Sequence, residues 1–98
     1  MGGDIAASRG RRLHEHLAAT RERPIERVAS RWIGEADAIA DDLFGAGEAA
    51  YEPAVIGDRV GHIATLLSNV KETGDPVADE HVEAARDLAE AMLESNAE

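Results

Sequence analysis

Apolar residues recur along most of the chain at intervals of three or four positions, which is the period of an amphipathic α-helix. Prolines and glycines interrupt this pattern, and they favour the first position of a helix and the position after its last residue, respectively. No segment combines period-two alternation with β-branched side chains, so no strand is expected. The pattern predicts a single all-α domain, residues 1–98, with four helices over about residues 4–20, 24–44, 53–72 and 76–94.

The second predicted helix has the clearest division into an apolar and a polar face. Its apolar face is expected to contain Ile25, Val28, Ala29, Trp32, Ala36, Ile39, Ala40 and Leu43. Charged residues, Asp37 among them, occupy the opposite face. Trp32 is the only tryptophan of the chain and is expected to anchor the core.

The third predicted helix has two different faces. Its large apolar residues follow a 4-3-4-3 spacing typical of a seam between helices: Ile56, Val60, Ile63, Leu67 and Val70. Opposite them lies a small-residue face, formed by Gly57, Gly61, Ala64 and Ser68. Two glycines inside a helix cost about 1 kcal/mol each relative to alanine. Close approach of another backbone would offset this cost, from a helix of the same chain or from the same helix of a second subunit.

The fourth predicted helix has the most specific start signal. Asp75 is a favoured N-cap residue, and Pro76 follows it at the first helical position. Asp79 and Glu80 stand in the first turns, where the helix dipole favours negative charge. We therefore expect this helix to begin at residue 76.

Large apolar side chains are few for a chain of 98 residues. Leucine, isoleucine, valine and phenylalanine together number 20, which is near the boundary below which charged sequences fail to fold. Folding is therefore expected to depend on helix propensity, on salt or on a partner. The predicted architecture is an up-and-down four-helix bundle, and dimerisation is an alternative way to complete it.

Acidic residues outnumber basic ones, and arginine is far more frequent than lysine. Nine of the ten basic residues are arginine, and twenty acidic residues bring the net charge to −10. An acidic surface over a thin core is typical of proteins that work in molar salt, where repulsion is screened to within about 3 Å at 1 M. The alternative interpretation is an ordinary acidic helical protein of a GC-rich bacterium.

A resemblance favours the first of these interpretations. The runs LHEHLAATRERPIERVASRWIGEADAIADDL and VGHIATLLSNVKETGDPVADEHVEAARDLAEAML are similar to short uncharacterised haloarchaeal proteins. The similarity covers roughly residues 11–94, with RWIGEA and ETGDP as its most specific parts. That group has no established activity, so the resemblance implies a halophilic origin and no functional residues.

Charge is also divided along the chain. Residues 1–31 have a net charge of +3, and residues 32–98 have a net charge of −13. The favoured interpretation is that arginines of the first part pair with carboxylates of the second part inside one bundle. The alternative is a nucleic-acid or ribonucleoprotein-binding module that uses Arg9, Arg11, Arg12, Arg21 and Arg23. Salt weakens phosphate binding steeply, and the acidic remainder would repel a polyanion, so this alternative is disfavoured.

The chain has no strong catalytic motif. It has no cysteine, which excludes disulfides and thiolate chemistry, and it has neither a Glu-x-x-His nor a His-Glu-x-x-His sequence. The run GAGEAA has the letters of a dinucleotide fingerprint, but it follows a predicted helix rather than a strand. His16 and His81 both fall on inner helix faces, so a metal site that they form with carboxylates is a second alternative. No cofactor is expected.

These observations predict a non-enzymatic protein. Because no apolar stretch is long enough for a signal peptide or a membrane span, we expect a soluble, cytoplasmic chain. Its expected role is that of an interaction or scaffold module, which contacts a second copy of itself or another protein. The small-residue face or an exposed apolar stripe is the predicted contact.

Overall fold

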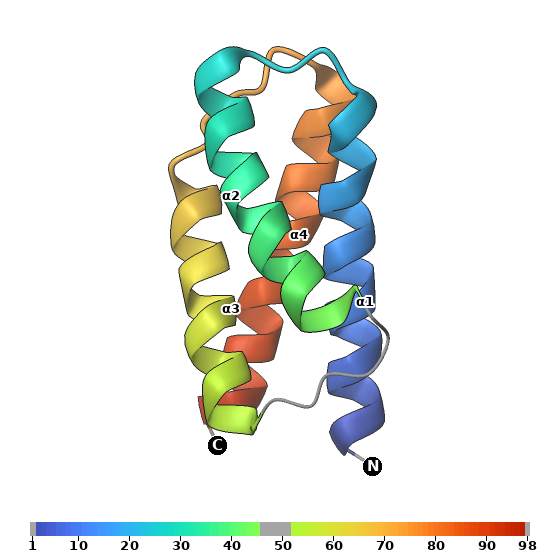
Figure 1. Cartoon of the computed structure of the whole chain (residues 1–98), viewed down its shortest axis with the longest axis vertical. Coiled ribbons are helices and arrows are strands. Elements are labelled where there is room, and N and C mark those ends of the chain that lie inside the picture. The colour runs from blue at the N-terminus through green and yellow to red at the C-terminus, as the bar shows by residue number, and fades with distance from the viewer. Residues whose placement is uncertain (1, 46–51, 98) are drawn as a thin grey trace.

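The computed structural model describes the backbone of residues 2–45 and 52–97, and the side chains of residues 8–45, 52 and 54–94. In these ranges the elements are α1 (Gly2–Ala19), the short 3₁₀ helix η1 (Thr20–Glu22), α2 (Arg27–Phe44), α3 (Pro53–Ser68) and α4 (Pro76–Ala97), and no strand is present. The helices run up and down, so that α1 begins at the end of the bundle where α4 finishes (Figure 1).

Each long helix packs against two others. The helix α1 contacts α2 and α4, and α3 contacts the same two helices from the other side. This closed ring confirms the predicted four-helix bundle within one chain. None of the described helices is long and apolar enough to cross a membrane.

Three helices were predicted to begin at a proline, and this is confirmed for two of them and wrong for α2. Helices α3 and α4 begin at Pro53 and Pro76, whereas α2 begins at Arg27 rather than at Pro24. Arg23 has φ −91° and ψ 147°, an extended conformation favoured for a residue that precedes a proline. The chain therefore leaves η1 in a non-helical segment and enters α2 three residues after the proline.

The end of α3 also differs from the prediction, because the helix stops at Ser68 and not at residue 72. Ser68 Oγ and Asn69 Nδ2 both donate to the carbonyl oxygen of Thr65, at 2.6 and 3.0 Å, and so satisfy an acceptor of the last turn. Gly74, the first glycine after the predicted end of this helix, lies in the following loop, where its φ of 86° favours glycine. The predicted end of α2 before Gly45 is confirmed.

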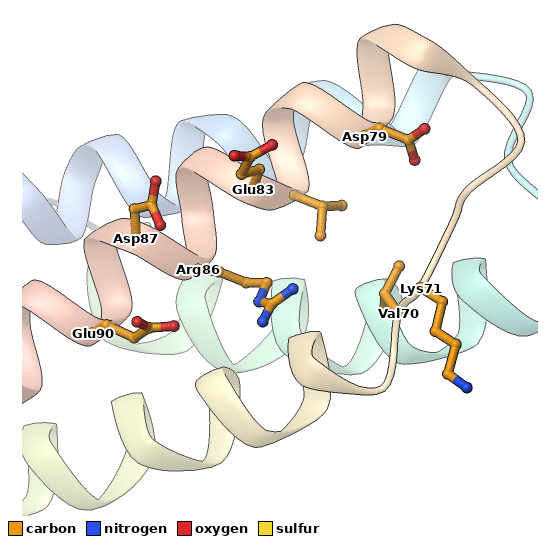
Figure 2. Close-up of a pocket in the computed structure, with 8 residues that line it drawn as sticks. Val70, Lys71, Asp79, Glu83, Arg86, Asp87 and Glu90 are labelled. Carbon is orange, nitrogen blue, oxygen red and sulfur yellow. The ribbon is translucent and has the colours of Figure 1, made fainter.

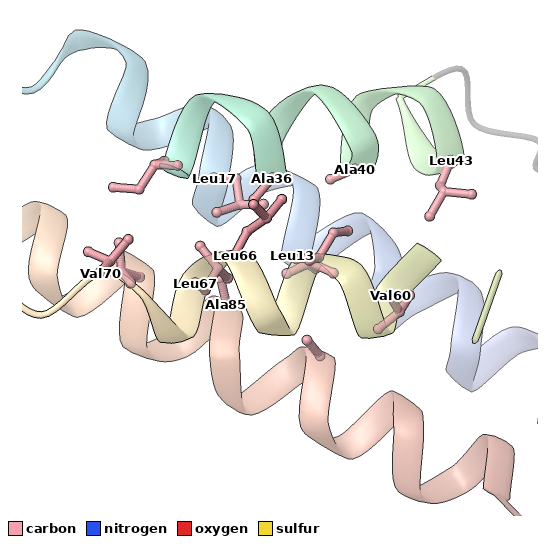
Figure 3. Close-up of a cluster of buried hydrophobic side chains, with 14 of the residues drawn as sticks. Leu13, Leu17, Ala36, Ala40, Leu43, Val60, Leu66, Leu67, Val70 and Ala85 are labelled. Carbon is pink, nitrogen blue, oxygen red and sulfur yellow. The ribbon is translucent and has the colours of Figure 1, made fainter. Parts of the chain in front are cut away.

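The core lies between all four helices and contains mainly leucine, valine, isoleucine and alanine (Figure 3). Its largest fully buried apolar side chains are Leu13, Leu17, Leu43, Val60, Ile63 and Leu67. Burial of such side chains supplies most of the favourable free energy of folding. The alanines among them allow the helices to pack closely with few bulky side chains.

The inner face of α2 is rotated relative to the prediction. Ile33 is 3% exposed, whereas Val28, which was predicted to face the core, is 60% exposed, and Trp32 is half-buried. Asp37, predicted on the polar face, is buried. The centre of the inner face is lined by alanines: Ala29, Ala36 and Ala40. At about 100° per residue, Val28 falls at the edge of the face that these alanines define, whereas Ile33 falls within it.

Candidate functional site

A groove of about 490 Å³, the α3–α4 groove, lies between α4 and the loop that joins α3 to α4 (Figure 2). It is lined by Val70, Lys71, Asp79, Val82, Glu83, Arg86, Asp87 and Glu90. Apolar atoms of Val70 and Val82, both buried, contribute to the lining, and charged groups surround them. The groove therefore offers both apolar and ionic contacts.

Helical periodicity places the charged residues of α4 in this groove. Asp79, Glu83, Arg86 and Glu90 follow a 4-3-4 spacing, so they share one side of the helix. Figure 2 shows Arg86 directed toward α3, with carboxylates along α4 on either side of it. Lys71 comes from the loop after α3. The sequence interpretation missed this site, although the 4-3-4 spacing was a usable signal.

The small-residue face of α3 approaches α4 at Gly61. A Cβ atom at Gly61 would lie 3.9 Å from Leu93 Cδ2, which is an ordinary van der Waals distance. At Gly61, therefore, a side chain of α4 approaches α3, and the expected close approach of two backbones does not occur there. Gly57, Gly61 and Ala64 are half-buried, and Ser68 is exposed. Their predicted role in interaction stays a prediction.

Two of the five candidate arginines form ion pairs with buried carboxylates. Arg21 donates from Nε and Nη2 to Asp37, at 2.6 and 3.0 Å. Arg23 donates from the same two atoms to Asp75, at 2.7 and 2.9 Å. These hydrogen bonds raise the pKa of both guanidinium groups. For these two residues, the expected pairing between the basic and acidic parts of the chain is confirmed.

The other three candidate arginines lie on α1. Arg11 and Arg12 are exposed, and Arg9 is half-buried. Because Arg21 and Arg23 already hold carboxylates in bidentate geometry, a phosphate would have to displace Asp37 or Asp75 to reach their Nε and Nη2 donors. The five arginines do not form one free basic surface.

Asp75 connects the loop before α4 to the first turn of that helix. Its Oδ2 accepts from Ala78 N at 3.0 Å, which confirms the predicted N-cap. Neighbouring Thr73 is fully buried, and its Oγ1 and backbone N both contact Asp79 Oδ1, at 2.7 and 2.8 Å. The hydrogen bonds from Arg23, followed by the one from Ala78, hold the pKa of Asp75 below its ordinary value.

Acid is expected to destabilise the bundle through Asp75. Because its folded pKa is below the unfolded value, the stabilisation is complete above the unfolded pKa and is lost as pH falls through the folded one. Asp75→Asn is therefore expected to flatten the fall in stability between pH 5 and pH 3, measured by urea unfolding. Asp58→Asn, at an exposed position of α3, is the matched control and is expected to retain the wild-type profile. Identical profiles for Asp75→Asn and wild type would contradict this assignment.

His16 and His81 meet at the seam between α1 and α4. Their Nδ1 atoms are 2.9 Å apart, and the two ring centroids are 5.2 Å apart. Desolvation first, and then the charges of His81 and Arg12, lower the pKa of His16. The structure thus brings together the two histidines that were considered as ligands of a metal site. Among the described side chains, however, no group of three or more histidines and carboxylates is placed to hold a metal ion.

Comparison with known proteins gives a family for the chain. The model of a domain of unknown function, DUF8152, matches residues 9–98, and the chain belongs to this family. No curated protein and no solved structure is significantly similar to it. The family is uncharacterised, as the resemblance noted in the sequence implied.

Proposed function

We propose that this member of the DUF8152 family is a non-enzymatic interaction module that self-associates through the α3–α4 groove. The observation that supports the proposal is the mixture of charges along that groove, which is lined by two cations, Lys71 and Arg86, and by four acidic residues: Asp79, Glu83, Asp87 and Glu90. A twofold dimer joins identical surfaces, so a surface that holds both signs provides cations that can face the carboxylates of the second copy.

The distribution of basic residues supports this choice of surface. Residues 32–98 contain only three basic residues, and two of them, Lys71 and Arg86, line the groove. Elsewhere on this part of the chain, a second copy would meet mainly negative charge.

We also propose that the protein functions in the cytoplasm of a halophile. A net charge of −10 on each chain opposes association in dilute buffer, and molar salt screens this long-range repulsion. Ion pairs that become buried in the interface are screened less, so the contact itself persists in salt. The pairing of Arg21 and Arg23 with carboxylates disfavours the nucleic-acid alternative.

Reversal of the groove cations is expected to abolish self-association. In light scattering after size exclusion in molar KCl, wild type is expected to exceed the mass of one chain. Lys71→Glu/Arg86→Glu is expected to weaken the dimer about tenfold or more, because like charges then face one another across the interface. Arg11→Glu/Arg27→Glu makes the same change in net charge at exposed positions outside the groove and is expected to leave the mass unchanged.

A complementary pair of variants tests whether the groove itself makes the contact. Glu83→Lys/Glu90→Lys, at two exposed positions of the groove, is expected to associate poorly alone and to form a mixed dimer with Lys71→Glu/Arg86→Glu. Circular dichroism of each variant checks that the helices are retained. A strictly monomeric wild type at high protein concentration in molar KCl would overturn the proposal.

A further inference from the structure

The contact between His16 and His81 has the geometry of a hydrogen bond. The centroid separation of 5.2 Å is close to the sum of the 2.9 Å Nδ1–Nδ1 distance and the radii of two imidazole rings. Each Nδ1 therefore points along the line that joins the rings. A metal ion held by both atoms would need their lone pairs to converge on a third point, and this arrangement does not provide that convergence.

Such a bond accommodates a limited number of protons. When both rings are neutral, one Nδ1 carries a hydrogen and the other presents a lone pair. One added proton, on the far nitrogen of the donor ring, keeps this arrangement. A second added proton gives both Nδ1 atoms a hydrogen, which removes the acceptor and places two cations side by side. The bond between α1 and α4 is then replaced by repulsion.

Few other charges act on the pair. The groups that act on His16 are His81 from α4, and Arg12 and Glu15 from α1. On α1, Arg9 lies a further turn beyond Arg12, and on η1 Glu22 is exposed. On the α2 side of α1, Asp37 and Asp41 pair with Arg21 and His14.

On α4, Glu80 precedes His81 and is exposed. The positions one turn from His81 carry no charge: Val77, Ala78, Ala84 and Ala85. No carboxylate on α4 thus lies one turn from His81 to compensate a second positive charge there. On α1, the cation Arg12 disfavours a positive charge on His16.

The geometry points to a proton-operated latch: the His16–His81 bond fastens α1 to α4 while the pair carries at most one positive charge, and double protonation releases α1 from the bundle. This inference is independent of self-association through the α3–α4 groove, because the latch lies on the α1–α4 seam. It assigns a pH response to two of the four histidines of the chain.

The direction of the response follows from the pKa of His16. Burial and the neighbouring cations lower this pKa, so the unfolded chain binds more protons than the folded chain as pH falls through about 6.5. Stability is therefore complete at higher pH and declines through this window. Asp75 does not contribute there, since its pKa lies below the ordinary carboxylate value.

The test compares urea unfolding of three proteins in molar KCl at pH 7.5 and pH 5.5. In wild type the unfolding equilibrium constant is expected to rise by about threefold to tenfold per pH unit, because one extra proton on the unfolded chain corresponds to about tenfold. His16→Gln/His81→Gln replaces the pair by amides that hydrogen-bond without titrating, and it is expected to lose this response. His62→Gln changes an exposed histidine of α3 and is expected to keep it.

His14 lies 3.1 Å from Asp41, and all three proteins retain this contact, so the comparison between them does not depend on it. An unchanged pH response in His16→Gln/His81→Gln would overturn the inference. Hydrogen exchange of wild type gives a readout that does not depend on a variant. Protection of α1 amides, corrected for intrinsic rates, is expected to fall at pH 5.5 before that of α3. If nitrogen NMR shows both imidazoles protonated while α1 stays protected, the latch does not exist.

Discussion

Replacement of Gly10 by alanine is expected to destabilise the bundle, although alanine is the better helix former. The ring of Phe44 lies directly against the backbone of α1 at this position. An added Cβ would be 2.8 Å from Phe44 Cζ and closer still to two other ring carbons. Alanine gains about 1 kcal/mol in helix propensity, whereas overpacking costs about 1–3 kcal/mol. We expect a net loss of about 1–2 kcal/mol in the free energy of unfolding.

Gly34 provides the matched control, since it lies inside α2 and nothing is within 4 Å of an added Cβ. Gly34→Ala is expected to raise the free energy of unfolding by about 0.5–1 kcal/mol. Urea unfolding in molar KCl measures both changes. In a Phe44→Ala background, Gly10→Ala is expected to become stabilising as well. If Gly10→Ala stabilised the protein as much as Gly34→Ala, the contact with Phe44 would be disproved.

Ile33→Ala is expected to cost far more stability than Val28→Ala on the same helix. Both changes remove a β-branched side chain, so the gain in helix propensity is similar. Ile33 is 3% exposed, and its truncation leaves a cavity that costs about 2–5 kcal/mol. Val28 is 60% exposed, and its truncation is expected to change stability by about 0.5 kcal/mol or less.

This pair of variants separates the two orientations of α2. The orientation expected from the sequence, with Val28 in the core, predicts a large loss for Val28→Ala. The observed orientation predicts a large loss only for Ile33→Ala. Urea unfolding measures both losses, and equal losses would show that α2 is rotated differently.

The sequence predicted some features of the candidate sites, and others depended on the tertiary structure. Positions of His16 and His81 on inner helix faces were evident from periodicity, and the structure brings the two side chains into contact. Their collinear hydrogen bond was not predictable, because it depends on the relative height and rotation of α1 and α4. The partners of Arg21 and Arg23 depend on the same quantities: the sequence indicated carboxylates, but not Asp37 and Asp75.

Local features of the chain were sufficient to predict the four helices and two of their starts. Periodicity, N-caps and prolines act within a few residues, so Pro53 and Asp75-Pro76 could be interpreted without a partner helix. Three features could be identified only from the tertiary structure: the rotation of α2, the contact of Phe44 with Gly10 and the α3–α4 groove. In a core rich in alanine, several helix orientations satisfy the same apolar pattern, and only the simultaneous packing of all four helices selects one.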